Sequence, residues 1–180
     1  MEQIFYILLE LAKKENHVRS IAKELNINHM TSSRILKELY VKNVIEFEKK
    51  GRNKVYHIKN TEEARNYLVM AEIYKLNQRI TKYPVLRKIA KEIQNNSNVN
   101  IALLFGSYAK DKIREKSDID IFIKTDDKTI KKEIQKINTR ISVKTGDLND
   151  NPLAREIKND HVIIKGAEEY YDKYFFKKTS

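Results

Sequence analysis

The chain has 180 residues and a formal net charge of +11, with 41% hydrophobic and 34% charged residues. It contains no cysteine, which excludes a disulfide framework and a metal site built on thiolates. Its apolar runs, such as residues 101–105, are too short to span a bilayer, and the N-terminus lacks the charge order of a signal peptide. We therefore expect a soluble, cytoplasmic protein with no membrane partner.

The excess of positive charge is densest in the first 98 residues. Residues 1–60 carry a net charge of +5 and residues 61–98 a net charge of +3, whereas the longer remainder carries +3. A field of this sign steers polyanions toward a surface, so nucleic acid is an expected partner for the N-terminal part. At this point a solvated, lysine-rich surface without a polyanionic partner is the alternative.

Helical periodicity and turn signals predict three helices and two strands in residues 1–60. The helices are expected at 1–15, 20–25 and 31–42, the last with Thr31 as its N-cap, and the strands at 44–48 and 54–58. The segment between the strands, KKGRN, contains a glycine and an asparagine that can adopt the positive φ of a tight turn. The pattern predicts a compact helical unit with a basic hairpin.

This order of elements, over IAKELNINHMTSSRILKELYVKNVIEFEKKGRNKVYHI, resembles the winged helix-turn-helix family. The resemblance implies that the third helix enters the major groove of double-stranded DNA while the hairpin contacts the flanking phosphates. The expected DNA-binding residues are polar or basic and lie on that helix or in the hairpin: Ser32, Ser33, Arg34, Lys37, Lys49, Lys50, Arg52 and Lys54. A winged helix used for protein contacts remains an alternative.

Residues 61–98 are predicted to form a helical connector. Apolar residues recur at helical spacing over residues 61–78, and Pro84 stands at the start of a second helix over residues 85–94. The apolar stripe of these helices is suited to packing on either neighbour or to forming the seam of a homodimer, and the sequence does not choose between them.

From Val99 onward strands alternate with helices, and two short motifs follow each other at a fixed distance. An apolar strand over residues 101–105 ends at Gly106-Ser107, and Asp118-Ile119-Asp120 follows ten residues later, in a second predicted strand. Because side chains alternate along a strand, Asp118 and Asp120 are expected on the same face, with Cα atoms about 6.6 Å apart. The pattern therefore predicts a pair of carboxylates near a Gly-Ser turn.

Such a pair has a definite chemistry. Two neighbouring carboxylates repel each other unless a cation lies between them, and oxygen ligands of this kind suit Mg²⁺. Gly106 permits a close approach to the backbone, and Ser107 offers a hydroxyl and an N–H to a phosphate. The motifs thus predict a site for a nucleotide with a bound metal ion, arranged for attack on the α-phosphorus.

The segment LFGSYAKDKIREKSDIDIFI resembles the signature of minimal nucleotidyltransferases of the polymerase-beta superfamily. The resemblance extends over residues 99 to about 165. It implies that Gly106 and Ser107 bind the nucleotide, that Asp118 and Asp120 bind Mg²⁺, and that Ser107, Asp118 and Asp120 are catalytic. The substrate would be a nucleoside triphosphate, ATP being expected, and the resemblance allows a protein acceptor, such as a toxin of the HEPN RNase type.

Two departures from the family pattern concern the activity. Asp111 stands where relatives often have glycine. Relatives that are active usually have a third carboxylate on the next strand, here expected at residues 139–144, yet Ser142 and Lys144 would face the site there. Asp147 and Asp150 lie just beyond that strand and would reach the site only if its predicted end is wrong.

The expected fold class is α+β, with a winged helix-turn-helix at residues 1–60, a helical connector at 61–98 and a nucleotidyltransferase-fold mixed sheet with helices at 99–180. Two functions fit these predictions. The first is transfer of a nucleoside monophosphate from a Mg²⁺-bound triphosphate to an acceptor. The second is transcription regulation through DNA, with a nucleotidyltransferase domain that binds nucleotide without turnover.

Overall fold

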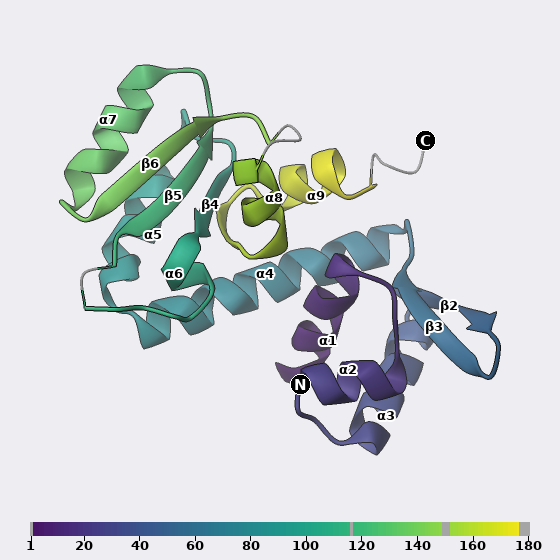
Figure 1. Ribbon diagram of the computed structural model, residues 1–180. Coiled ribbons are helices and arrows are strands. Elements are labelled where there is room, and N and C mark those ends of the chain that lie inside the picture. Colours follow the sequence, from purple (N-terminus) through teal and green to yellow (C-terminus); the bar gives the residue numbers. More distant parts are fainter. Residues whose placement is uncertain (1, 116, 149–151, 177–180) are drawn as a thin grey trace. The chain divides into compact units, whose positions relative to one another are not determined.

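The computed structural model describes residues 2–115, 117–148 and 152–176, and the chain divides into two compact units (Figure 1). The N-terminal unit holds the described residues up to Glu72 together with residues 174–176, and the C-terminal unit holds Ile73 to Lys173. Helix α4 (Glu62–Lys82) contains the division between them. The division therefore falls inside the connector predicted for residues 61–98, and not at either of its ends.

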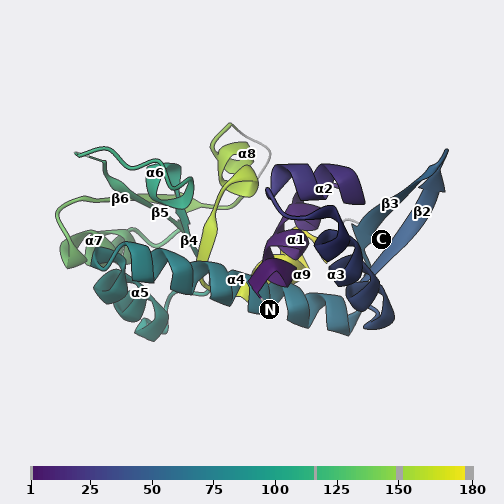
Figure 2. The same ribbon diagram turned by 90° about the horizontal axis from the view of Figure 1, so that it is seen from below.

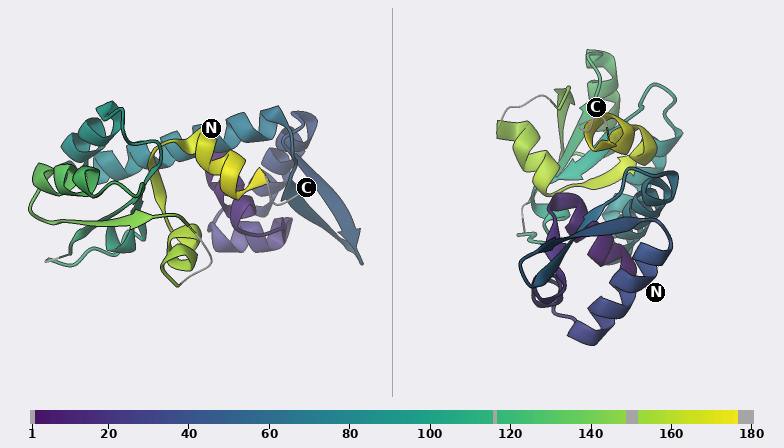
Figure 3. Two further views of the ribbon diagram at one scale, coloured as in Figure 1. Left: turned by 90° about the horizontal axis from the view of Figure 1, so that it is seen from above. Right: turned by 90° about the vertical axis from the view of Figure 1, so that its right-hand side faces the viewer.

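The N-terminal unit follows the predicted order of elements. Its elements are α1 (Glu2–Lys13), β1 (Asn16–His17), α2 (Val18–Glu24), α3 (His29–Val41), β2 (Ile45–Lys50) and β3 (Asn53–Ile58). The strands form an antiparallel sheet in the order β1-β3-β2, and the β2–β3 hairpin extends away from the helices (Figure 3). Its sheet therefore has one strand, β1, that the sequence did not predict.

Helix α3 begins earlier than predicted because a different residue caps it. The side chain of Asn28 accepts a hydrogen bond from the Met30 amide at 2.8 Å, so Asn28 is the N-cap and Thr31 lies inside the first turn. Asn26, at φ 51°, adopts the left-handed conformation that asparagine tolerates and separates this cap from α2. The correction moves the N-cap by three residues, from Thr31 to Asn28, and the helix buries Ser32 together with Ile35, Leu36 and Leu39.

The helices after the hairpin are as expected in kind but longer. Helix α4 runs to Lys82, four residues beyond the predicted end at Gln78. The hydroxyl of Thr61 accepts a hydrogen bond from the Ala64 amide at 3.2 Å at its start. Helix α5 (Val85–Asn95) follows Pro84, as predicted. No helix in the described ranges is long and apolar enough to cross a membrane.

The C-terminal unit is built around a mixed four-stranded sheet. Strands β4 (Ala102–Phe105), β5 (Ile119–Lys124), β6 (Ile141–Gly146) and β7 (Val162–Lys165) lie in the order β6-β5-β4-β7, and only the β5–β6 pair is parallel. The helices between these strands are α6 (Gly106–Ala109), α7 (Lys128–Ile137) and α8 (Pro152–Asn159), and α9 (Ala167–Tyr174) follows β7. The mixed sheet and its helices confirm the predicted α+β class.

One face of this sheet forms the main core of the unit. Helices α5 and α7 lie on the same side of the sheet (Figure 2), where their isoleucines pack against Ile119, Ile121 and Ile123 of β5 and against Ile141 and Val143 of β6. Because side chains alternate along a strand, the residues between these isoleucines point to the opposite face. That opposite face carries Asp120, and Asp118 lies just before β5 begins.

Candidate functional site

The Gly-Ser turn and the carboxylates meet at one end of the β4–β5 pair. These strands are antiparallel, and Phe105, the last residue of β4, lies opposite Asp120 near the start of β5. Gly106 and Ser107 follow Phe105 directly in the short helix α6. The two motifs, ten residues apart in the sequence, are therefore neighbours in the structure (Figure 1).

Gly106 leaves room for the carboxylate beside it. Its φ of +69° lies in the left-handed region, and a Cβ placed on it would collide with Oδ2 of Asp120. The absent side chain thus lets the Asp120 carboxylate lie against the backbone where β4 turns into α6. Ser107, which comes next, is partly exposed, and its carbonyl accepts a hydrogen bond from the Lys112 amide at 2.9 Å.

The two carboxylates differ in exposure. Strand β5 begins at Ile119, so Asp118 lies just before the strand and is exposed, whereas Asp120 lies within it and is half-buried. Burial raises the pKa of Asp120 above its usual value, and the negative charge of Asp118 acts in the same direction. The Ser142 hydroxyl and the Lys144 ammonium oppose these effects by lowering that pKa. The two carboxylates thus repel each other, and a bound cation would relieve this repulsion.

Strand β6 brings no carboxylate to the site. Ile141 and Val143 are buried in the core, so Ser142 and Lys144 lie on the carboxylate face, with Ser142 directly opposite Asp120 in the register. This arrangement confirms that Ser142 and Lys144 face the carboxylate side, but the strand covers Ile141–Gly146 and not the predicted residues 139–144. Among the described residues, no group of three or more histidine, aspartate or glutamate side chains is arranged to hold a metal ion.

Of the two acids that follow β6, Asp147 forms an ion pair with a lysine of α9. Asp147 comes directly after the strand, and its carboxylate accepts hydrogen bonds from the Leu148 amide and from Lys173 Nζ, each at 2.8 Å. This ion pair engages Asp147 with helix α9. Asp150 lies outside the described residues.

Asp111, which replaces a glycine of the family pattern, fixes the turn after α6. Its φ of 60° is left-handed, which explains why glycine suits this position. The carboxylate of Asp111 accepts hydrogen bonds from Lys82 Nζ at 2.7 Å and from the Tyr83 hydroxyl, and Arg79 lies 3.6 Å from it. These contacts hold the pKa of Asp111 below its usual value and tie the turn to the end of α4.

One further acid near the site is not apparent from the sequence. Glu156 of α8 is close enough to Asp120 for its charge to raise the Asp120 pKa, and it forms an ion pair at 2.7 Å with Lys110, just after α6. No pattern in the sequence indicates this contact, because Lys110 and Glu156 are 46 positions apart along the chain. The ion pair links α8 to the Gly-Ser turn.

The residues predicted to contact DNA are exposed, with one exception. Ser33, Arg34 and Lys37 lie on the solvent side of α3. Ser32 is completely buried, and its hydroxyl donates to the carbonyl of Asn28 at 3.2 Å. The prediction that Ser32 contacts DNA is therefore wrong: at three and four residues before Ile35 and Leu36, it lies on the buried face of the helix.

The basic residues of the hairpin are all exposed, but two of them have partners. Lys50 forms an ion pair with Glu15, and the Lys54 ammonium lies 4.1 Å from the centre of the Phe47 ring. Lys49 and Arg52 have no ion pair among the described residues. The hairpin thus presents at least these two cations to solvent near its turn.

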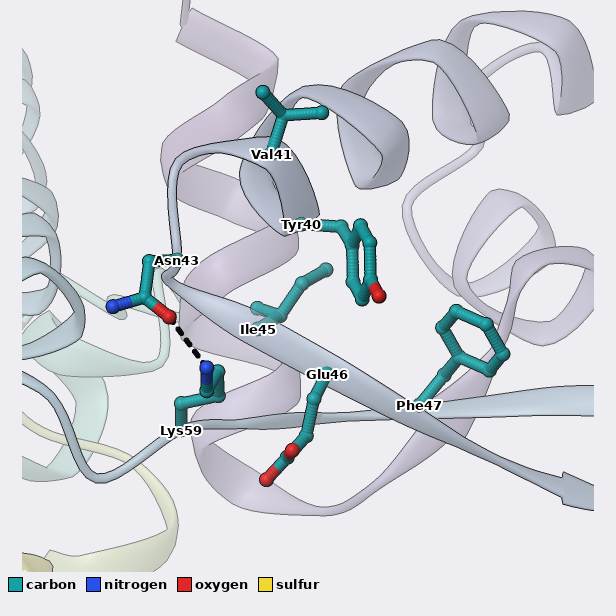
Figure 4. Close-up of a pocket in the computed structure, with 7 residues that line it drawn as sticks. All are labelled: Tyr40, Val41, Asn43, Ile45, Glu46, Phe47 and Lys59. Carbon is teal, nitrogen blue, oxygen red and sulfur yellow. Dashed lines mark hydrogen bonds between the residues drawn. The ribbon is translucent and has the colours of Figure 1, made fainter.

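A hollow of about 410 Å³ opens in the N-terminal unit, where the end of α3 meets β2 (Figure 4). Its lining includes the rings of Tyr40 and Phe47, whose centres are 5.4 Å apart, and the side chains of Asn43 and Lys59, which are hydrogen-bonded to each other. Glu46 is the acid in the lining, so the hollow has no carboxylate pair and no chemistry like that of the β4–β5 site.

Comparison with known families gives one result for the C-terminal unit. Residues 87–170 match the family model described as "Polymerase beta, Nucleotidyltransferase", and the match includes β4 to β7 and the paired motifs. Comparison with curated proteins gives no match. The family match supports the nucleotidyltransferase superfamily for this unit, in agreement with the resemblance noted in the sequence.

Proposed function

We propose that the C-terminal unit transfers a nucleoside monophosphate from a nucleoside triphosphate, ATP being the expected one, to an acceptor with release of pyrophosphate. The observation that carries the proposal is the contact between the Gly106-Ser107 turn and the Asp120 carboxylate, with Asp118 beside it. The family match over residues 87–170 supports the same chemistry.

The carboxylate pair fits a divalent metal ion. Asp118 and Asp120 are hard oxygen donors whose charges repel each other, and Mg²⁺ is usually bound by one or two such carboxylates together with substrate phosphates. Bound there, Mg²⁺ would polarise the triphosphate for displacement of pyrophosphate. Ser107 would donate its hydroxyl to a phosphate oxygen, and the open backbone at Gly106 would let the phosphates approach.

The test is transfer of label from α-labelled ATP in the presence of Mg²⁺, to the protein or to an added acceptor. Asp118→Asn and Asp120→Asn are each expected to lower transfer by at least about 100-fold, since each removes a metal ligand. The matched control is Asp126→Asn, which neutralises an exposed carboxylate just beyond the other end of β5. Equal transfer by the wild type and both site variants would contradict the proposal.

The same experiment decides between turnover and regulation. Wild-type protein that binds ATP with Mg²⁺ but transfers no label to any acceptor would favour the alternative, a regulator whose nucleotidyltransferase domain binds nucleotide without turnover. The lack of a third carboxylate on β6 supports that alternative. A protein acceptor, such as a toxin partner, is the class to try first, because the family resemblance allows it.

We propose as a second function that the N-terminal unit is a winged helix-turn-helix that binds double-stranded DNA. The order of its elements and the three-stranded sheet support this, as do the exposed Arg34 and Lys37 on α3 and the exposed Lys49 and Arg52 in the hairpin. The test is duplex binding by the Arg34→Ala plus Arg52→Ala variant, which is expected to bind DNA at least about tenfold more weakly at roughly 0.1 M salt.

A further inference from the structure

On the carboxylate side of the sheet, strand β6 carries a lysine, whereas the family resemblance leads us to expect an acid on this strand. Ser142 lies opposite Asp120, and Lys144 lies opposite Phe122, one step further along the same face. From the spacing of strands and residues, the Cα atoms of Lys144 and Asp120 are roughly 8 Å apart, a distance that a lysine side chain can span. The Lys144 ammonium is near enough to lower the Asp120 pKa.

Lys144 differs from its neighbours in having no counter-ion in the described part of the chain. Lys110 is paired with Glu156 at 2.7 Å, Lys124 with Glu169 at 3.0 Å and Lys173 with Asp147 at 2.8 Å. Lys144 is exposed and forms no ion pair with any residue that the structure describes. Its charge therefore remains available to an anion bound on this face.

The balance of charge at the site calls for such a cation. One divalent ion would offset the two negative charges of Asp118 and Asp120, and the phosphates of the nucleotide would remain to be neutralised. A second metal ion would lack a third carboxylate from β6 to hold it, since the position opposite Asp120 is Ser142. A lysine ammonium binds phosphate as a point charge on a flexible stem.

We propose that Lys144 binds the phosphate groups of the nucleotide and supplies the positive charge that a second metal ion would bring, so that the site works with one divalent ion. This inference rests on the proposed nucleotide site at Gly106, Ser107, Asp118 and Asp120. It gives Lys144 of β6 a role in binding the substrate.

The first experiment measures binding of a non-hydrolysable ATP analogue in the presence of Mg²⁺ by titration calorimetry. Lys144→Gln is expected to weaken binding by about 10- to 100-fold, the usual effect of removing a charged hydrogen-bonding group, and Lys144→Arg should retain most of the affinity. The matched control, Lys132→Gln, removes an exposed lysine of α7, which packs on the opposite face of the sheet, and should leave the affinity unchanged. Equal affinity of wild type and Lys144→Gln would overturn the proposal.

The second experiment counts bound metal ions by electron paramagnetic resonance of Mn²⁺ with the same analogue. The wild type is expected to bind one Mn²⁺ per chain, and Ser142→Asp, which places a carboxylate opposite Asp120, is expected to bind a second. Two Mn²⁺ ions per wild-type chain would overturn the proposal. If the wild type binds no analogue at all, the proposed nucleotide site fails and this inference with it; if only the Lys144 result is negative, the nucleotide site stands.

Discussion

At the scale of single residues, two left-handed positions shape the candidate site. At Gly106 the Asp120 carboxylate occupies the space that a side chain would fill. Asp111 has a φ of 60° and contacts Arg79 and Lys82 at the end of α4 and Tyr83 just after it. The conformation at Gly106 makes room for a carboxylate of the site, whereas the conformation at Asp111 goes with the packing of the turn after α6 against α4. A side chain added at Gly106 should therefore disturb Asp120, and with it the function of the site, in addition to straining the left-handed backbone.

This difference can be measured with two glycines of nearly equal φ. Gly51→Ala, at φ +61° with open space around it, is expected to lower the free energy of unfolding by about 1 kcal/mol through backbone strain alone. Gly106→Ala, at φ +69°, must also displace Asp120, and we expect the free energy of unfolding to fall by about 2–4 kcal/mol, together with weakened ATP binding. Denaturant unfolding and calorimetry provide the two measurements. Equal destabilisation of the two variants would show that Asp120 yields to the added methyl group.

At the scale of elements, helix α7 depends on its cap. The side chain of Asp127 accepts hydrogen bonds from the amide and hydroxyl of Thr129, both at 2.7 Å, and the helix buries Ile130 and Ile134 in the core behind the carboxylate face. These hydrogen bonds hold the pKa of Asp127 below its usual 3.8. The start of α7 is thus stabilised by an ionised carboxylate.

The cap predicts a pH dependence with a definite sign. Because the pKa of Asp127 is lower in the folded than in the unfolded protein, its contribution is complete above the unfolded value and is lost as the pH falls through the folded value. Asp127→Ala should lower the melting midpoint by about 2–4 °C at about pH 7. Asp127→Asn keeps a capping oxygen without the charge, so the advantage of the wild type over it should shrink from about pH 5 to about pH 2. A difference in melting midpoint that is constant over this range, measured by circular dichroism, would contradict this account.

At the scale of the whole molecule, the net charge of +11 attracts any polyanion, so DNA binding by itself would not identify a surface. The proposed surface makes a narrower prediction, because the cations of α3 and the hairpin lie in the N-terminal unit, whereas exposed cations such as Arg87 and Lys91 lie in the C-terminal unit. The salt dependence of binding should report which cations contact phosphate.

Each cation that no longer neutralises a phosphate should reduce the slope of log K against log salt by about 0.9. Arg34→Ala plus Arg52→Ala is therefore expected to reduce that slope by roughly 2. The control, Arg87→Ala plus Lys91→Ala, removes the same charge from the exposed side of α5 and should leave the slope near that of the wild type. Fluorescence anisotropy of a labelled duplex at several salt concentrations checks both; equal slopes for the two double variants would exclude the surface on α3 and the hairpin.

From the residues alone, the order of most elements and the meeting of the Gly106-Ser107 turn with the Asp118 and Asp120 pair could be predicted, because periodicity and motif spacing are local properties of the chain. The sequence also predicted that Ser142 and Lys144 face the site, since alternation along a strand needs no knowledge of its neighbours. Strand β1 and helix α7 were not predicted, being a two-residue strand and a segment for which no pattern was singled out.

Which residues meet across long stretches of chain could not be predicted, because it depends on the packing of the folded protein. The Lys110–Glu156 pair beside Asp120 and the engagement of Asp147 by Lys173 depend on how elements pack, and packing brings together residues that no local pattern relates. Side-chain partners are chosen by the surrounding elements once the core has formed, whereas periodicity and spacing are already present in the unfolded chain.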